Sequence, residues 1–160
     1  MERSQLPELL RGHPLMKPLS EDQLLCFAKA GELELYEPGE VIVTEGTLGD
    51  AIYLILAGRT HVCKKKAGDR ELAELCEGEF FGEMSLVEAT ARSATVLATT
   101  TTKVFRLPNQ ELQRLAEEDP QCMNRVLVVI VRTLSSRLRR MNDTLATVAQ
   151  LSDWLAGTIV

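Results

Sequence analysis

The sequence predicts a mainly β fold with flanking α-helices, in which a sandwich or barrel lies between an N-terminal helix and a long C-terminal helix. Short apolar segments separated by Gly-containing turns follow one another from about residue 32 to residue 107. Their spacing of about 8–12 residues is typical of sandwiches and barrels. A capping-box pattern precedes them at residues 20–23, and no Pro or Gly occurs between Pro120 and Gly157. These two features favour helices on either side of the β region.

The composition agrees with one ordinary globular domain. The chain has 160 residues, of which 45% are hydrophobic and 26% charged, and its net charge is −5. This negative charge argues against nucleic acid as the main partner. No apolar run approaches the roughly 20 residues of a membrane span, and the N-terminus lacks the apolar core of a secretory signal. We therefore expect a soluble, cytoplasmic protein with no membrane partner.

We divide the sequence into an N-terminal arm (1–19), a β domain (20–118), a long helix (119–156) and a tail (157–160). Three prolines make the arm irregular or limit it to short helical turns. Ser20 as N-cap and Gln23 three residues later predict a helix over 21–30 that Gly31 ends. We expect this helix to bury one face, made of Leu24, Leu25, Phe27 and Ala28.

The β region is expected to contain seven strands, which alternate polar and apolar residues or are apolar throughout. They cover residues 32–36, 41–44, 51–56, 59–65, 70–76, 93–98 and 103–107. The lysines at 64–66 precede a hairpin turn at 67–69 and are expected to be solvated there. Asn109 is expected to cap a helix over 110–117, and Asp119-Pro120 to begin the long helix.

The cysteines and histidines do not indicate a metal site. The four cysteines form no CxxC pair and are expected to be small buried apolar residues. His13 and His61 are far apart in the sequence and do not make a ligand cluster. The sequence also lacks a nucleophile–base pair, a GxSxG motif and a P-loop. We therefore do not expect an enzyme.

The long helix carries an a/d heptad seam. Apolar side chains follow a 4-3 rhythm at Leu127, Val131, Leu134, Leu138, Met141, Leu145 and Val148, and the rhythm continues to Ser152 and Leu155. A seam this narrow predicts a homodimer through paired helices. The alternative is a helix that folds back along its own barrel. Five arginines against three aspartates after residue 118 indicate a solvated flank rather than a DNA-binding patch.

Residues 80–88 interrupt the strand pattern with a short helical turn that offers an anion site. Gly82 lets a ligand approach closely, and a turn beginning there presents free backbone N–H groups. Arg92 can bind a phosphate with two N–H groups, and Ser93 adds a hydroxyl donor. Glu83 can accept a hydrogen bond from a sugar hydroxyl. On spacing alone, a surface ion pair between Glu83 and Arg92 remains the alternative.

Two segments resemble the signatures of cyclic nucleotide-binding domains. The phosphate-binding cassette of that family is similar to Phe81-Gly82-Glu83-Met84-Ser85-Leu86 and, five residues later, Arg92-Ser93-Ala94-Thr95-Val96-Leu97-Ala98. A second family signature resembles residues 42–58, from Ile42-Val43-Thr44-Glu45-Gly46 to Ile55-Leu56-Ala57-Gly58. The resemblance extends over residues 14–151. It implies an eight-stranded jelly-roll (double-stranded β-helix) barrel with a long C-terminal dimerisation helix.

The resemblance also implies roles for the site residues. Glu83 would bind the ribose 2′-hydroxyl, and Arg92 would pair with the cyclic phosphate. Ser93 and the backbone N–H groups of Gly82 and Glu83 would complete the clamp. Comparison with the dimer helix of the catabolite activator protein type places Met141 and Asn142 near the base, although Asn142 can equally be an exposed helix residue. The implied ligand-binding set is Phe81, Gly82, Glu83, Met84, Ser85, Arg92, Ser93, Ala94, Met141 and Asn142.

Three positions bear on how closely the chain follows the family. Ala91 stands where the family often has Pro, which leaves the loop less constrained, and Ser85 stands where it often has Ala or Gly. A Thr after the arginine is associated with cGMP in some relatives, whereas this chain has Ser93. We therefore expect cAMP as the ligand, with cGMP possible.

The expected function is that of a regulatory module in signal transduction, in which cyclic nucleotide binding moves or stabilises the C-terminal helix. An unidentified downstream protein would receive the signal. One alternative is the sensing portion of a transcription regulator. Because the sequence ends at Val160, before any helix-turn-helix, we do not expect this chain to bind DNA. The other alternative is a dimerising scaffold of the same fold that binds no nucleotide.

Overall fold

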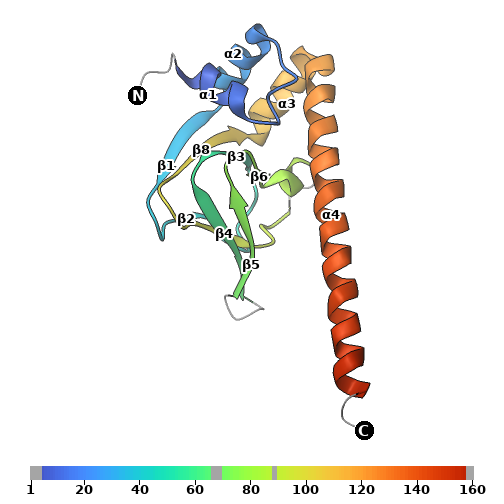
Figure 1. Cartoon of the computed structure of the whole chain (residues 1–160). Helices are drawn as coiled ribbons and strands as arrows, with labels where there is room; N and C mark the ends of the chain where they lie inside the picture. The colour runs from blue at the N-terminus through green and yellow to red at the C-terminus, as the bar shows by residue number, and fades with distance from the viewer. Residues whose placement is uncertain (1–4, 66–69, 88–89, 158–160) are drawn as a thin grey trace. The chain divides into compact units, whose positions relative to one another are not determined.

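The computed structural model describes residues 5–65, 70–87 and 90–157. The predicted hairpin turn at 67–69, together with Lys66, therefore lies outside the described residues. The chain forms two compact units, one of residues 1–126 and one of residues 127–160. The first contains the described strands, and the second is the remainder of the last helix (Figure 1).

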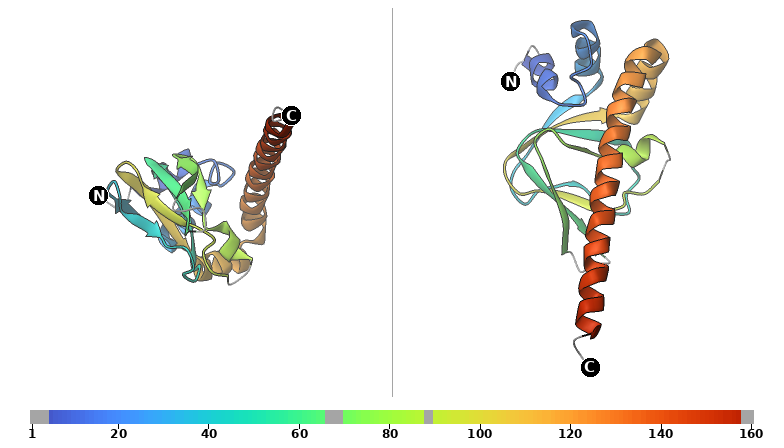
Figure 2. Two further views of the ribbon diagram at one scale, coloured as in Figure 1. Left: turned by 90° about the horizontal axis from the view of Figure 1, so that it is seen from below. Right: turned by 45° about the vertical axis from the view of Figure 1, so that its right-hand side comes forward.

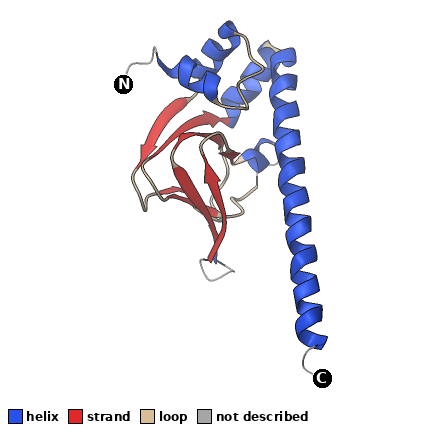
Figure 3. Ribbon diagram, viewed as in Figure 1, coloured by secondary structure: helices blue, strands red, loops and turns tan. Residues whose placement is uncertain are grey.

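The first unit is built on two four-stranded antiparallel sheets, which have the jelly-roll arrangement that the sequence predicts (Figure 3). The strand order is β1-β8-β3-β6 in one sheet and β2-β7-β4-β5 in the other. The strands are β1 (Glu32–Tyr36), β2 (Val41–Val43), β3 (Ala51–Ala57), β4 (Arg59–Lys64), β5 (Arg70–Cys76), β6 (Phe80–Phe81), β7 (Thr95–Ala98) and β8 (Thr102–Pro108).

The seven expected strands are present with ends that shift by at most two residues. The eighth, β6, was not expected because two residues are too few to show a period. It pairs with β3, opposite Tyr53 and Leu54. Its position matters because β6 leads directly into the predicted phosphate-binding turn.

The hydrophobic core lies between the sheets. Strand β3 is apolar along its whole length because it is central in its sheet and its first five residues are buried. One cluster of buried core residues consists of Ile42, Val43, Ala51, Tyr53, Ile55, Leu75, Phe81, Val96 and Val104. Two members, Tyr53 and Phe81, also take part in the candidate site below.

Three helices lie together at one end of the sheets (Figures 1 and 2): α1 (Leu6–Gly12), α2 (Glu21–Ala30) and α3 (Asn109–Glu118). The capping box of α2 is confirmed, with Ser20 Oγ 3.3 Å from the Gln23 N–H and Gln23 Oε1 3.0 Å from the Ser20 N–H. The buried face expected for α2 is only partly right. Leu24 and Phe27 are buried, but Leu25 is 40% exposed and Ala28 is half-buried. Ala30 takes the third buried position, at the i+3 spacing of a helix face.

Two further expectations were wrong in detail. Asn109 does not cap α3, because the N-cap is Pro108 and makes no side-chain cap bond. Of the cysteines, Cys122 is buried, whereas Cys26 is exposed and Cys63 and Cys76 are half-buried. Burial, and then the nearby Asp119 carboxylate, raise the pKa of the Cys122 thiol to about 11.

The last helix, α4 (Pro120–Gly157), is continuous, as the sequence predicts. Its seam residues from Leu127 to Val148 are between 37% and 65% exposed. Among the described residues, no helix combines the length and the apolarity that crossing a membrane requires.

Candidate functional site

The predicted phosphate-binding turn begins where β6 ends. Gly82 has a φ of +86°, in the left-handed region, and is the N-cap of the 3-10 helix η3 (Glu83–Leu86). The position also lacks space, since a Cβ would lie 2.7 Å from the Ala51 carbonyl oxygen and 2.7 Å from Arg92 Nη1. Glycine is therefore required here both for its backbone conformation and for its small size.

Arg92 is buried beside this glycine, with 9% of the residue exposed. Its Nη2 donates to the Ala51 carbonyl oxygen at 3.0 Å and contacts Asp50 Oδ1 at 3.4 Å. Its Nη1 is buried without a hydrogen-bond partner among the described residues. A buried charged donor without a partner is costly, so a ligand oxygen at Nη1 would remove a standing penalty.

Aromatic rings support the arginine from the core side. The Cζ atom of Arg92 lies 5.6 Å from the centroid of the Tyr53 ring, within the range of a cation–π contact. Tyr53 in turn stacks on Phe81, with ring centroids 5.0 Å apart and planes inclined by 4°. The guanidinium is thus placed against a rigid pair of rings supplied by β3 and β6.

Asp50 holds Arg92 from the other side and is itself shared between two arginines. Arg106 Nη2 lies 2.6 Å from Asp50 Oδ2, and Arg92 Nη2 lies 3.4 Å from Oδ1. Because the Asp50 side chain is 60% exposed, solvent screens both pairs and their contribution to stability is small. Their main effect is geometric, since the carboxylate limits the directions in which the Arg92 guanidinium can point.

The loop that delivers Arg92 is constrained by its backbone, despite Ala91 in place of a proline. Arg92 N–H donates to the Thr47 carbonyl at 2.7 Å, and Gly46 N–H donates to the Arg92 carbonyl at 2.9 Å. Leu48 and Ala91 form an isolated antiparallel bridge between the same segments. The two segments that resemble family signatures are therefore joined directly by main-chain hydrogen bonds.

The structure brings most of the predicted site residues together. Gly82 and Arg92 are adjacent, and a Cβ on Gly49 would touch both Ser85 and Arg92. Ser93 Oγ lies 3.9 Å from Met84 Sδ. Glu83 begins η3, and Ala94 follows Ser93 as a half-buried residue.

Met141 and Asn142 lie in the second unit, residues 127–160, and are exposed on α4. Their proximity to a bound base therefore stays a prediction.

Four residues of the site were not predicted to belong to it: Gly49, Asp50, Tyr53 and Asn109, the last of which was expected only to cap α3. The first three lie inside the upstream segment that resembles a family signature, which was the available signal. Asn109 contacts Ser85, and no local pattern indicates a contact across 24 residues.

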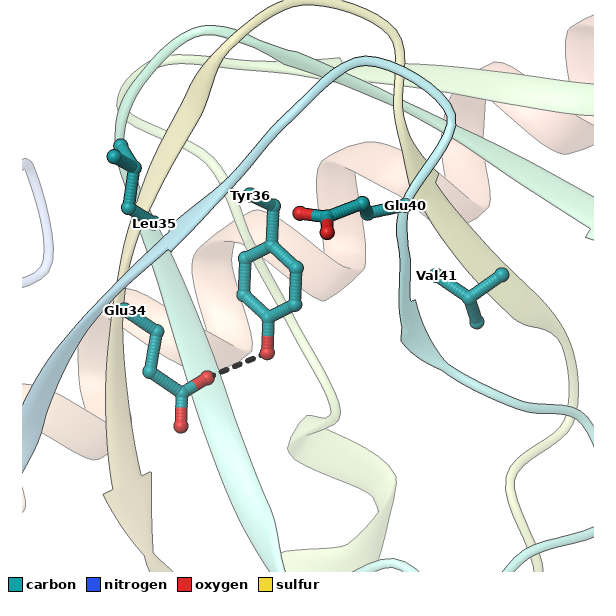
Figure 4. Close-up of a pocket in the computed structure, with 5 residues that line it drawn as sticks. All are labelled: Glu34, Leu35, Tyr36, Glu40 and Val41. Atoms are coloured by element: carbon teal, nitrogen blue, oxygen red, sulfur yellow. Dashed lines mark hydrogen bonds between the residues drawn. The ribbon is translucent and has the colours of Figure 1, made fainter.

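A separate open hollow lies at β1 and the start of β2, lined by Glu34, Leu35, Tyr36, Glu40 and Val41 (Figure 4). The Tyr36 hydroxyl donates to Glu34 Oε2 at 2.7 Å. Burial, and then this hydrogen bond, raise the pKa of Tyr36 above its ordinary value. The hollow shares no residue with the Arg92 site. Because two carboxylates line it, it does not suit an anionic ligand.

Comparison with known proteins gives one consistent family. The family model described as "Cyclic nucleotide-binding domain" matches residues 33–119. A cAMP-dependent protein kinase regulatory subunit from Eremothecium gossypii is 39% identical over 108 residues, which are 68% of this chain and 23% of that protein. The Cyclic AMP receptor protein of Thermus thermophilus is 30% identical over 127 residues, covering 78% of this chain and 59% of that protein. The chain thus spans less than two thirds of the length of these curated relatives.

Two similar solved structures are consistent with the same family. A cyclic nucleotide-binding domain from Methylobacillus flagellatus aligns with a TM-score of 0.76 at 25% identity, covering 88% of this chain and 80% of that one. The catabolite activator protein of Thermus thermophilus aligns with a TM-score of 0.70 at 29% identity, covering 85% and 63%.

Proposed function

The chain belongs to the cyclic nucleotide-binding domain family, and from this premise we propose that it is a non-catalytic regulatory module that binds cAMP, with cGMP as a weaker ligand. The observation that carries the proposal is the buried Arg92 guanidinium beside Gly82, whose Nη1 has no partner among the described residues. A cyclic phosphate carries one negative charge and exposed oxygens that can accept from this group.

Each part of the site has a role in this proposal. Arg92 binds the cyclic phosphate, and the N–H groups of Gly82 and Glu83 with the Ser93 hydroxyl complete the clamp. Glu83 accepts from the ribose 2′-hydroxyl. Two like charges cannot meet in the clamp, so the carboxylate of Glu83 suits the sugar and not the phosphate. Phe81, Met84, Ser85 and Ala94 form the surrounding cassette, and Met141 and Asn142 contact the base.

Pre-placement of Arg92 supports useful affinity. Arg92 is already buried in the folded protein, so ligand binding does not have to remove it from water. Its guanidinium is also already ordered, because the Ala51 carbonyl, Asp50 and the Tyr53 ring hold it in place. A ligand therefore gains a charged hydrogen bond without ordering a flexible arginine. Hydrogen bonds to charged groups contribute about 1.5–3 kcal/mol each.

Isothermal titration calorimetry with cAMP and cGMP tests the proposal. We expect Arg92→Ala to lower cAMP affinity by about ten- to a hundredfold, since the charged hydrogen bond from Nη1 is lost. Arg132→Ala removes an exposed arginine and serves as the control with unchanged affinity. If the unaltered protein gives no heat with either nucleotide while remaining folded, the proposal is wrong and a nucleotide-free scaffold is favoured.

We further propose that α4 pairs with the same helix of a second copy and that ligand binding acts on this pair. The support is the heptad seam, whose residues from Leu127 to Val148 are exposed at every position. A ligand shifts the helices only if it binds one arrangement more tightly than the other.

Sedimentation equilibrium with and without cAMP tests the dimer. Leu138→Glu places a charge on the seam and should give a monomer. Gln150→Glu adds the same charge off the seam and should remain a dimer. A monomer for the unaltered protein at all concentrations, or a dimer for Leu138→Glu, would contradict the pairing.

A further inference from the structure

The side chain of Asn109 reaches from the start of α3 to the phosphate-binding turn. Its Nδ2 donates to the Ser85 carbonyl oxygen at 2.9 Å and to Ser85 Oγ at 3.2 Å. A carbonyl oxygen only accepts, so the amide nitrogen must face Ser85. The amide oxygen points away and is buried without a partner among the described residues. This side chain therefore gives up a helix-cap bond for a contact with the turn.

Ser85 passes this contact on to the residue that begins the turn. Ser85 Oγ donates to the Gly82 carbonyl oxygen at 2.8 Å, and Ser85 N–H contacts the same oxygen at 3.2 Å. Gly49 leaves the space for this serine, because a Cβ there would lie 2.6 Å from Ser85 Cβ. These hydrogen bonds, from Asn109 to Ser85 and from Ser85 to Gly82, connect the last turn of η3 to its N-cap and fix the η3 backbone.

Asn109 also holds the opposite side of the clamp through its backbone. Its N–H donates to the Asp50 carbonyl oxygen at 2.8 Å. The Asp50 side chain contacts Arg92. A single residue at the junction of β8 and α3 is thus bonded both to the segment that orients Arg92 and to the turn that offers backbone N–H groups.

We propose that Asn109 is a positioning residue for the cyclic nucleotide site, which holds the turn at residues 82–86 in its binding geometry through Ser85 before any ligand is present. The inference rests on the proposed function for the identity of the ligand. Its physical basis is preorganisation, since N–H groups fixed in advance bind an anion without the entropic cost of ordering the turn. The Ser85 hydroxyl, which the Ala or Gly frequent in the family lacks, adds a second acceptor for Asn109 beside the Ser85 carbonyl oxygen and donates to the Gly82 carbonyl oxygen.

An isosteric substitution isolates the donor. Asn109→Asp keeps the shape of the side chain but places a carboxylate oxygen against the Ser85 carbonyl oxygen, where two acceptors repel. A negative charge in the first turn favours the helix, so α3 itself is not weakened. Asn124→Asp makes the same chemical change at an exposed position of α4 and is the matched control. Ser85→Ala removes only Ser85 Oγ, which accepts from Asn109 Nδ2 and donates to the Gly82 carbonyl oxygen, and leaves the Ser85 carbonyl contact in place.

Two measurements on these variants test the proposal. In the ligand-free protein, we expect Asn109→Asp to speed hydrogen exchange of the Ser85 amide by about tenfold, whereas exchange of the core amide of Val104 stays as in the control. With cAMP, we expect Asn109→Asp to weaken affinity by about tenfold and Ser85→Ala by about threefold, as expected for one or two lost hydrogen bonds.

The outcomes separate the two proposals. If the unaltered protein binds cAMP and Asn109→Asp binds it as tightly as Asn124→Asp, the positioning role is wrong and the function stands. If Ser85 exchange is unchanged in the ligand-free variant, the positioning role is likewise overturned. If the unaltered protein binds neither nucleotide, the proposed function fails, and the exchange measurement still decides whether Asn109 holds the turn.

Discussion

Replacing Gly82 by alanine tests the geometry of the site most directly. The added Cβ would lie 2.7 Å from Arg92 Nη1 and 2.7 Å from the Ala51 carbonyl oxygen. Ordinary contact begins at 3.4 Å, so the guanidinium or the turn must withdraw by about 0.7 Å. Because Arg92 Nη2 donates to that same carbonyl, the change displaces both the proposed phosphate-binding guanidinium and the carbonyl oxygen that holds it.

The expected magnitude has two parts. Forcing a non-glycine residue into the left-handed region costs about 1–2 kcal/mol of stability. Misplacing a charged donor costs about 1.5–3 kcal/mol in binding, which is about ten- to a hundredfold in affinity. Gly39→Ala separates the backbone cost from the binding cost. Gly39 has a φ of +92° and nothing within 4 Å of its Cβ position, so its replacement carries only the backbone cost.

The assay combines urea unfolding with cAMP titration on both variants. We expect each to lose about 1–2 kcal/mol of unfolding free energy from the backbone term. Only Gly82→Ala should also lose affinity. If Gly82→Ala binds cAMP within about twofold of Gly39→Ala, the guanidinium is not held where the structure places it, and the reasoning fails.

Three further predictions follow from other contacts. Asp50→Ala frees the Arg92 guanidinium and should weaken cAMP affinity by about threefold to tenfold with little change in the urea midpoint, as measured by calorimetry and unfolding; unchanged affinity would contradict the orienting role. Burial lowers the pKa of His13 below 6.5, so its neutral form stabilises the fold, and unfolding free energy should be constant above pH 6.5 and fall below it. In urea unfolding between pH 7.5 and pH 5, the unfolding free energy of His13→Gln should fall less with decreasing pH than that of the unaltered protein. An equal fall in both proteins would exclude His13 as the cause. Gly31→Ala would bring a Cβ within 2.3 Å of Phe105 Cζ and should cost about 1–3 kcal/mol by urea unfolding, with cAMP affinity unchanged once folded.

Local chemistry explains which elements the sequence could predict. The α2 helix follows from Ser20 and Gln23 because both partners of a capping box lie within one turn. The strands follow from alternation over four or more residues. Strand β6 could not be predicted, because its two residues show no period and its pairing with β3 is a tertiary contact. Leu25 was misassigned because it lies beside the buried face, and the helix packs on the side of Ala30 instead.

The residue types of the proposed phosphate site could be predicted from the sequence, but their arrangement could be predicted only in part. Gly82 and Arg92 carry the chemistry of an anion site in their side-chain types and spacing. Asn109 shows where such reasoning ends. From the sequence, an Asn just before a helix is expected to be its N-cap. In the structure, the Asn109 amide instead donates to the Ser85 carbonyl oxygen, 24 residues away in the sequence and 2.9 Å away in space. Only the three-dimensional structure reveals that competition.

The sharing of Asp50 between two arginines bears on how the site changes charge when it is filled. Before binding, Arg92, Arg106 and Asp50 sum to one positive charge, and a cyclic phosphate brings this sum to zero. If Asp50 were paired with Arg92 alone, drawing Arg92 toward a phosphate would leave a carboxylate beside an anion. Arg106 at 2.6 Å keeps that carboxylate paired throughout, so the ligand does not have to break an exclusive ion pair. The same argument predicts that Arg106→Ala weakens cAMP binding although Arg106 need not touch the ligand, and that Asp50→Ala in the same chain restores part of the loss. Calorimetry on the single and double variants decides it, and equal losses in Arg106→Ala and the double variant would contradict it.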